Sequence, residues 1–185
     1  TEVRPDSTEA WEERAICLVA LGRKAEAVSS YDSVLQLDPR REPAWVARGY
    51  LLLELSRSEE ALQSFTQATS LRLHDLEAWF GKGLALEMLQ RWDEAQAAFG
   101  ETLRLDKDHV GAHAHLGWAL FSTGRYAEAI VQYDDAIRLG GEQPELLLAK
   151  GLCHEGTGDN LAAMSLYDRV LAGDEAGGDL GAGPG

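Results

Sequence analysis

The sequence predicts an all-α protein built as a solenoid, in which helix pairs stack one after another. Three observations predict it. Residues of the same kind recur every 34 positions, each copy carries an alanine followed four residues later by an aromatic residue, and no insertion interrupts the register over five copies. Repeats of about 20–50 residues are typical of stacked architectures, because one helix pair cannot bury its apolar face alone.

The recurring residues occupy fixed positions of each copy. A large residue stands at Trp11, Trp45, Trp79, His113 and Leu147, and a small one follows at Ala15, Gly49, Gly83, Gly117 and Gly151. The second half holds Ala27, Ala61, Ala95, Ala129 and Ala163, with Tyr31, Phe65, Phe99, Tyr133 and Tyr167 four residues later. This pattern resembles the tetratricopeptide repeat family, with its W-x2-L-G-x2-Y and A-x3-F signature. The resemblance covers Thr8 to about Leu171 and implies a right-handed α-solenoid.

Each repeat is expected to form two helices joined by a short turn. In chain order the helices are predicted at 8–21 and 24–37, 42–55 and 58–71, 76–89 and 92–105, 110–123 and 126–139, and 144–157 and 160–171. Glycine marks the turn at Gly22, Gly124 and Gly158, whereas Ser56 and Gln90 replace it in the middle copies. Pro39, Pro43 and Pro144 stand at the joints between repeats, where a helix start tolerates a missing N–H.

The repeats define the predicted domain organisation. The array spans 8–171, as repeats 8–41, 42–75, 76–109, 110–143 and 144–171, with no internal boundary. Residues 1–7 are expected to end a preceding repeat, because Pro5 stands 34 residues before Pro39. Residues 172–185 are expected to form a flexible, glycine-rich acidic tail. The apolar edge of the last helix, at Leu161, Met164 and Leu171, therefore has no obvious cover. Either the parent chain continues, the tail folds back, or another molecule sits there, which includes self-association through uncapped ends.

Charge restricts the classes of partner. The chain has 31 acidic and 17 basic residues and a formal net charge of -14, so it should repel nucleic acid and anionic membrane surfaces. No apolar stretch is long enough to insert in a membrane. Cys17 and Cys153 both hold position 10 of their repeats and are expected to be packed small apolar residues, too far apart for a disulfide. The absence of a disulfide framework favours a cytoplasmic location.

The first helix of each repeat divides into two faces when positions are counted from Thr8, Glu42, Leu76, Val110 and Pro144 at about 100° per residue. Positions 4, 7, 8 and 11 cluster on the face that packs on the second helix. Positions 2, 5, 6, 9, 12 and 13 lie on the opposite side, here called the candidate arc. In the family that this chain resembles, the arc forms the concave surface on which ligands lie.

The candidate arc carries large apolar residues, eight glutamates and no lysine or arginine. We expect about half of its apolar side chains to pack against neighbouring repeats instead of facing a partner. The predicted partner-binding residues are Tyr50, Leu53, Phe80, Leu84, Trp118, Phe121 and Leu148, with Glu12, Glu13, Glu54 and Glu87 at the edges. An apolar trough with acidic edges suits an amphipathic segment that carries basic residues.

No pattern of residues points to catalysis, a cofactor or a metal. His109, His113 and His115 have a spacing that can bind zinc, but their helical phases differ, so no shared metal is expected. Phosphate-binding and nucleophile motifs are absent. The sequence therefore predicts a non-catalytic protein–protein interaction scaffold that binds a peptide or helix of another protein. The alternatives are a segment of a larger enzyme or regulator that recruits substrate, and a self-associating assembly unit.

Overall fold

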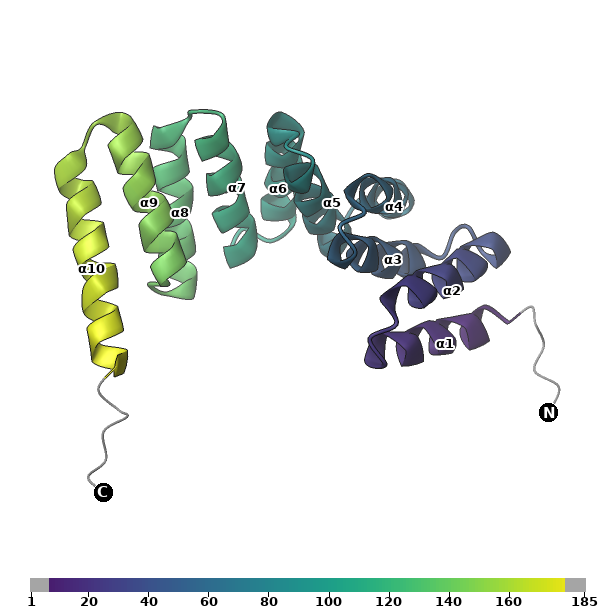
Figure 1. Ribbon diagram of the computed structural model, residues 1–185. Helices are drawn as coiled ribbons and strands as arrows, with labels where there is room; N and C mark the ends of the chain where they lie inside the picture. The colour runs from purple at the N-terminus through teal and green to yellow at the C-terminus, as the bar shows by residue number, and fades with distance from the viewer. Residues whose placement is uncertain (1–6, 179–185) are drawn as a thin grey trace, which may run out of the picture. The chain divides into compact units, whose positions relative to one another are not determined.

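The structure is a computed structural model that describes residues 7–178, with the side chains of residues 7–172. Within that range the backbone forms ten α-helices and no strand, arranged as five consecutive pairs (Figure 1). Every predicted helix start coincides with an observed start, and the ends agree within one residue except at the last helix. Of the segment 1–7, only Ser7 is described, and its side chain accepts a hydrogen bond from the Ala10 N–H at the start of the first helix (3.2 Å).

Packing groups the helices into two compact units, Thr1–Leu105 (unit 1) and Asp106–Gly185 (unit 2). Unit 1 contains α1 (Thr8–Ala20), α2 (Lys24–Leu37), α3 (Glu42–Glu54), α4 (Ser58–Leu71), α5 (Leu76–Met88) and α6 (Trp92–Leu105). Unit 2 contains α7 (Val110–Ser122), α8 (Tyr126–Gly140), α9 (Pro144–Thr157) and α10 (Asn160–Gly178). The 34-residue period continues through the division unchanged, so the periodicity carries no sign of it.

In unit 1 each first helix packs on the second helix of its own repeat, and α3 and α5 also pack on the second helix of the repeat before. Gly49 and Gly83 lie where the two helices of one repeat approach. A Cβ at Gly49 would stand 2.6 Å from the Phe65 ring, and one at Gly83 would also meet the Phe99 ring inside 3.0 Å. Both rings are fully buried, so they cannot move aside. The packing of each repeat therefore requires glycine at these two positions.

Gly81 holds position 6, which the sequence assigned to the candidate arc. A Cβ there would collide with Phe65 of the preceding repeat, and Gly81 is buried. For this residue the assignment is wrong. The helical phase separates a helix into faces, but it does not show that the preceding repeat reaches around to position 6.

In unit 2 the two helices of a repeat approach each other in the same way, with tyrosine in place of phenylalanine. A Cβ at Gly117 would stand 3.0 Å from the Tyr133 ring, and one at Gly151 would collide with Tyr167. The buried core of the unit also includes Leu120 and Cys153. Helix α9 packs on both α8 and α10, which continues the repeat-to-repeat contact inside this unit.

The turns inside the repeats share one backbone conformation. Gly22, Gly124 and Gly158 have φ of 73°, 76° and 84°, which lie in the left-handed region that glycine adopts without steric cost. Ser56 and Gln90 hold the same place with φ of 57° each. The geometry of the turn thus persists where glycine is absent, and the two substituted turns carry backbone strain.

Helix α10 is longer than the sequence predicted. It continues to Gly178, so residues 172–178 of the predicted flexible tail are helical. Glycine inside a helix costs only about 1 kcal/mol relative to alanine, and the alanines and Glu175 in this stretch favour helix, so glycine content alone did not mark the end. Residues 179–185 of the predicted tail lie outside the described residues.

The two cysteines have different surroundings. Cys153 is fully buried, and burial raises the pKa of its thiol to about 11. Cys17 is exposed, so the prediction that it is packed is wrong. Position 10 is covered by the second helix of the preceding repeat, as at Leu51, and no described residue supplies that helix to α1.

Candidate functional site

In unit 1 the candidate arc contains an apolar hollow of about 280 Å³ between α1 and α3. Its lining residues are Ile16, Val19, Tyr31, Ala47, Tyr50, Leu51 and Glu54. Ile16 and Tyr50 both hold position 9, so the repeat places them on neighbouring helices at the same level. Ile16 is 54% exposed and Val19 is 41% exposed. These two side chains offer an apolar surface that remains open among the described residues.

Tyr50 forms a rigid wall of this hollow. Its hydroxyl donates to the backbone oxygen of Glu77 or to its carboxylate Oε2, each 3.0 Å away. The ring packs edge-on against Phe65, with 5.1 Å between centroids. Burial and then the Glu77 carboxylate raise the pKa of Tyr50, which keeps the phenol protonated and able to donate. Tyr50 therefore presents an ordered aromatic surface.

The other predicted apolar residues of unit 1 are half-buried. Leu53 packs against the core of the unit, and Phe80 lies 5.9 Å from Phe99 between ring centroids. Leu84 is half-buried as well, whereas Met88 on the same helix is 48% exposed. Leu53, Phe80 and Leu84 therefore pack partly against the rest of unit 1 and leave only part of their surface on the arc.

The predicted acidic edge is partly neutralised. Arg41 holds Glu12 in a two-pronged ion pair, with its Nε 2.8 Å from Oε1 and its Nη2 2.6 Å from Oε2. Lys24 pairs with Glu54 at 3.0 Å. Glu13 is exposed and Glu87 is half-buried. Arg41 and Lys24 lie outside the first helices, so counting positions along those helices could not reveal these pairs.

In unit 2 the candidate arc presents an open aromatic patch. Trp118 stacks on Phe121 with 5.3 Å between ring centroids and 19° between planes. Phe121 in turn contacts Tyr126 at 5.5 Å, so the Trp118 ring rests on a supported aromatic layer. Trp118 is 41% exposed, and Leu148 and Leu152 are each 42% exposed. We name Trp118, Phe121, Leu148 and Leu152 the unit 2 patch.

The histidines at the start of α7 have separate structural partners. His109 caps the helix, because its Nδ1 accepts from the Ala112 N–H at 3.0 Å. His113 is buried, with its Nε2 3.0 Å from the Lys107 carbonyl oxygen and its Nδ1 2.9 Å from Gln132. Among residues 7–178, no group of three or more His, Cys, Asp and Glu side chains is placed to hold a metal ion. No helix in the described part of the chain is both long and apolar enough to cross a membrane.

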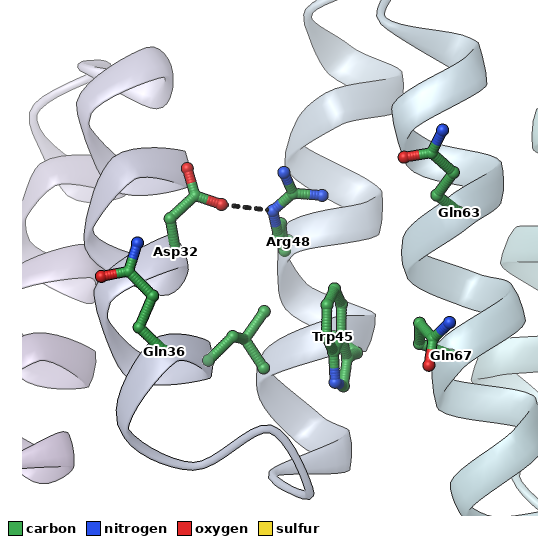
Figure 2. Close-up of a pocket in the computed structure, with 7 residues that line it drawn as sticks. Asp32, Gln36, Trp45, Arg48, Gln63 and Gln67 are labelled. Carbon is green, nitrogen blue, oxygen red and sulfur yellow. Dashed lines mark hydrogen bonds and ion pairs between the residues drawn. The ribbon is translucent and has the colours of Figure 1, made fainter.

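A second hollow of unit 1, of about 550 Å³, is mainly polar and is formed by α2, α3 and α4. Figure 2 shows Trp45 and Arg48 of α3 between the glutamines of the two flanking helices. Arg48 donates through Nε to Asp32 (2.7 Å) and through Nη1 to Ser64 (2.6 Å), so it ties three helices together. This arrangement was not predicted. The sequence does carry a signal for it, since an acid precedes a base by 16 residues here and again at Asp134 and Lys150.

The family model described as tetratricopeptide repeat matches residues 1–42, 46–95 and 89–144 of the chain. Among solved structures, a crystal structure of MamA is 22% identical, with 96% of this chain and 98% of that chain covered and a TM-score of 0.89. MamA from Desulfovibrio magneticus RS-1 is 16% identical, with coverage of 91% and 96% and a TM-score of 0.87. YrrB, a tetratricopeptide repeat protein described as having an unusual peptide-binding site, is 17% identical, with coverage of 90% and 86% and a TM-score of 0.80. No curated protein sequence matches the chain.

Proposed function

Since the chain belongs to the tetratricopeptide repeat family, whose members are generally non-catalytic interaction modules, we propose that it holds a segment of another protein on its candidate arc. The observation that carries the proposal is the exposed apolar surface at position 9 and its neighbours. Ile16 and Val19 open the hollow of unit 1, and Trp118 tops the unit 2 patch. Exposed aromatic and aliphatic side chains that are fixed from beneath are the usual anchors of a binding surface.

The chemistry of the arc suggests the chemistry of the segment. An apolar side chain of such a segment suits the hollow of unit 1, and one also suits the exposed Trp118 ring of unit 2, while lysine or arginine suits the carboxylates of the arc. The arc itself holds no lysine or arginine, and Glu13 stands exposed on it. Because Glu12 and Glu54 are already paired with Arg41 and Lys24, the electrostatic share of binding is smaller than eight glutamates would suggest. The net charge of -14 also disfavours nucleic acid as a partner.

Peptides selected on the full chain from a random displayed library test the proposal. We expect the selected sequences to combine apolar residues with lysine or arginine, and their affinity to fall moderately with salt, because rim charges are screened while apolar anchors are not. YrrB, with its described peptide-binding site, gives a precedent in a similar fold. Selected peptides that are acidic would contradict the proposal.

Matched variants locate the site. Trp118→Ala should cost about 2 kcal/mol of binding free energy if the indole is an anchor, mainly through a faster dissociation rate. Ile16→Asp tests unit 1, and Val131→Asp on α8 is its control, because the two side chains are 54% and 55% exposed. If Val131→Asp weakens peptide binding and Ile16→Asp does not, the candidate arc is the wrong surface.

A further inference from the structure

Two of the joints between successive repeats carry the same ionic contact. In unit 1 Asp32, at position 25 of its repeat, accepts from Nε of Arg48, at position 7 of the next repeat (2.7 Å). In unit 2 Lys150 at position 7 donates to Asp134 at position 25 (2.5 Å). The same two positions therefore pair twice in the chain, each time between the second helix of one repeat and the first helix of the next.

The apolar part of the joint is equally regular. On the second helix, positions 21 and 28 are covered by the next repeat, as at Val28 (2% exposed) and Leu35 (7%). On the first helix, positions 3 and 10 are covered by the preceding repeat, as at Ala44 (1%) and Leu51 (6%). In unit 2 the corresponding residues of α9, Leu146 and Cys153, lie in the core, and those of α8, Ile130 and Ile137, are partly buried and pack against it.

Helix α10 carries one half of such a joint without a cover. Met164 and Leu171, at positions 21 and 28, are 56% and 62% exposed, as the sequence predicted for this edge. Asp168 at position 25 is exposed and forms no ion pair within the described residues. Figure 1 shows α9 beside α10, and α10 packs on α9.

Helix α1 carries the other half. Ala10 and Cys17, at positions 3 and 10, are exposed where their counterparts in later repeats are buried. Arg14 at position 7 donates to Ser30 through Nη1, in the way that Arg48 donates to Ser64. The Arg48 Nε also reaches an aspartate of the preceding repeat, whereas Arg14 forms no ion pair in the described part of the chain.

We propose that α10 of one copy docks on α1 of a second copy, in the geometry that the chain already uses between its own repeats. Asp168 then meets the Arg14 Nε, and Met164 and Leu171 cover Ala10 and Cys17. The two surfaces match in charge and in the order of apolar and ionic positions, and small residues at positions 3 and 10 leave room for the larger side chains. Such a contact is heterologous, because it joins different surfaces of identical chains, and it does not use the candidate arc.

The first test is the mass of the full 185-residue chain in solution, measured by light scattering over a range of concentrations. The weight-average mass should rise with concentration, and a monomer mass at every concentration would overturn the proposal. Met164→Glu should abolish the rise, because it buries a charge in the new joint. Val131→Glu places the same charge on an equally exposed position of α8 and should leave the rise unchanged; loss of the rise in this control would also count against the proposal.

Charge exchange tests the pairing itself. Arg14→Asp and Asp168→Arg each bring like charges together, so each variant alone should associate at least about tenfold more weakly. In a mixture, each contact between one variant and the other pairs an aspartate with an arginine, so the mixture should regain the wild-type mass by alternating the two variants. A mixture that stays monomeric while both variants retain wild-type thermal unfolding would show that Asp168 and Arg14 do not meet. Peptide binding should be unaffected in both variants, which separates this contact from the proposed function.

Discussion

Unit 1 and unit 2 share the 34-residue period but differ in how the side chains of the candidate arc are packed and exposed. In unit 1 the arc folds around a hollow whose wall, Tyr50, is held by Glu77 and Phe65. In unit 2 the arc carries the unit 2 patch, in which Trp118 stacks on Phe121 and stays 41% exposed. The difference teaches that a repeat position specifies the direction of a side chain within its helix, while the neighbouring helix specifies whether that side chain is covered.

The units also differ at position 4, on the seam between the two helices of a repeat. The indoles of Trp45 and Trp79 donate to the carbonyls of Pro39 and Leu73, each at 2.9 Å. In unit 2, His113 bonds through Nε2 to the carbonyl of Lys107, which holds the same repeat position as those two residues. A smaller ring thus reproduces the hydrogen bond of the indole, and it adds a contact to Gln132.

The largest expected effect tests how tightly each seam is packed. Gly83→Ala should destabilise unit 1 by about 2–3 kcal/mol, because the new methyl group meets the fully buried Phe99 ring. Gly117→Ala should cost less than about 1 kcal/mol, since its Cβ stands 3.0 Å from Tyr133 and alanine favours helix. Urea unfolding measures both, and Gly100→Ala, with open space around it, is the control that should not destabilise. Equal costs at Gly83 and Gly117 would remove this difference between the units.

Position 4 provides the second test. His113→Phe keeps a ring but leaves the Lys107 carbonyl and Gln132 without their partner in a buried place, so it should cost about 2 kcal/mol. Trp45→Phe loses one hydrogen bond at a half-buried place that water can reach, so about 1 kcal/mol is expected. Thermal and urea unfolding of the two variants compare the seams. A larger loss for Trp45→Phe would show that the seam of unit 1 depends more on its hydrogen bond than that of unit 2 does.

A pH effect from the buried carboxyl group of Glu42 is expected in unit 1. Burial, and then the neighbouring Asp75 carboxylate, raise the pKa of Glu42, which is 5% exposed, and Arg72 offsets this only in part. The folded state therefore binds the proton more tightly than the unfolded state. The resulting stabilisation is full below the ordinary pKa of glutamate and is lost as pH rises through the raised folded pKa.

Glu42→Gln removes the carboxyl group whose ionisation at high pH destabilises the fold. The variant should therefore be more stable than the wild type by about 1 kcal/mol at pH 7 and should differ little from it at pH 4. Unfolding free energies at the two pH values measure it, and the exposed Glu59→Gln is the control. The equivalent positions of unit 2 hold Val110 and Pro144, so no carboxyl group stands there. A Glu42→Gln variant that is destabilised at pH 7 would show that the ion pair with Arg72 outweighs the burial of the charge.

The smallest effect concerns the turns. Unit 1 holds Ser56 and Gln90 at φ of 57°, whereas both turns of unit 2 have glycine there. Ser56→Gly and Gln90→Gly should each stabilise by about 0.5 kcal/mol, because relief of the left-handed strain exceeds the extra entropy of an unfolded glycine. Gly124→Ala should destabilise unit 2. Calorimetric Tm values rank the three variants, and a lower Tm for both glycine variants would contradict the strain.

Much of the fold could be predicted because it is local or strictly periodic. The helix starts, the close approach at Gly83 and the shared turn at Gly22 and Gly124 all follow from residues that recur every 34 positions. The exposed edge at Met164 and Leu171 was predicted in the same way and is confirmed. The end of α10 was missed, because a stretch rich in both glycine and helix-forming residues has no single local preference.

The candidate arc shows where periodicity stops being sufficient. The direction of Ile16 and Tyr50 follows from their common position 9, since helical phase is a property of the chain alone. Their surroundings do not follow from that position. Ile16 is 54% exposed, whereas Tyr50 is half-buried and its hydroxyl donates a hydrogen bond to Glu77, 27 residues further along the chain. In the same way, the repeat pattern places Glu12 at the acidic edge of the arc, but only the packed structure shows that it pairs with Arg41. Exposure and pairing are set by helices brought together in space, so only the folded chain could assign them.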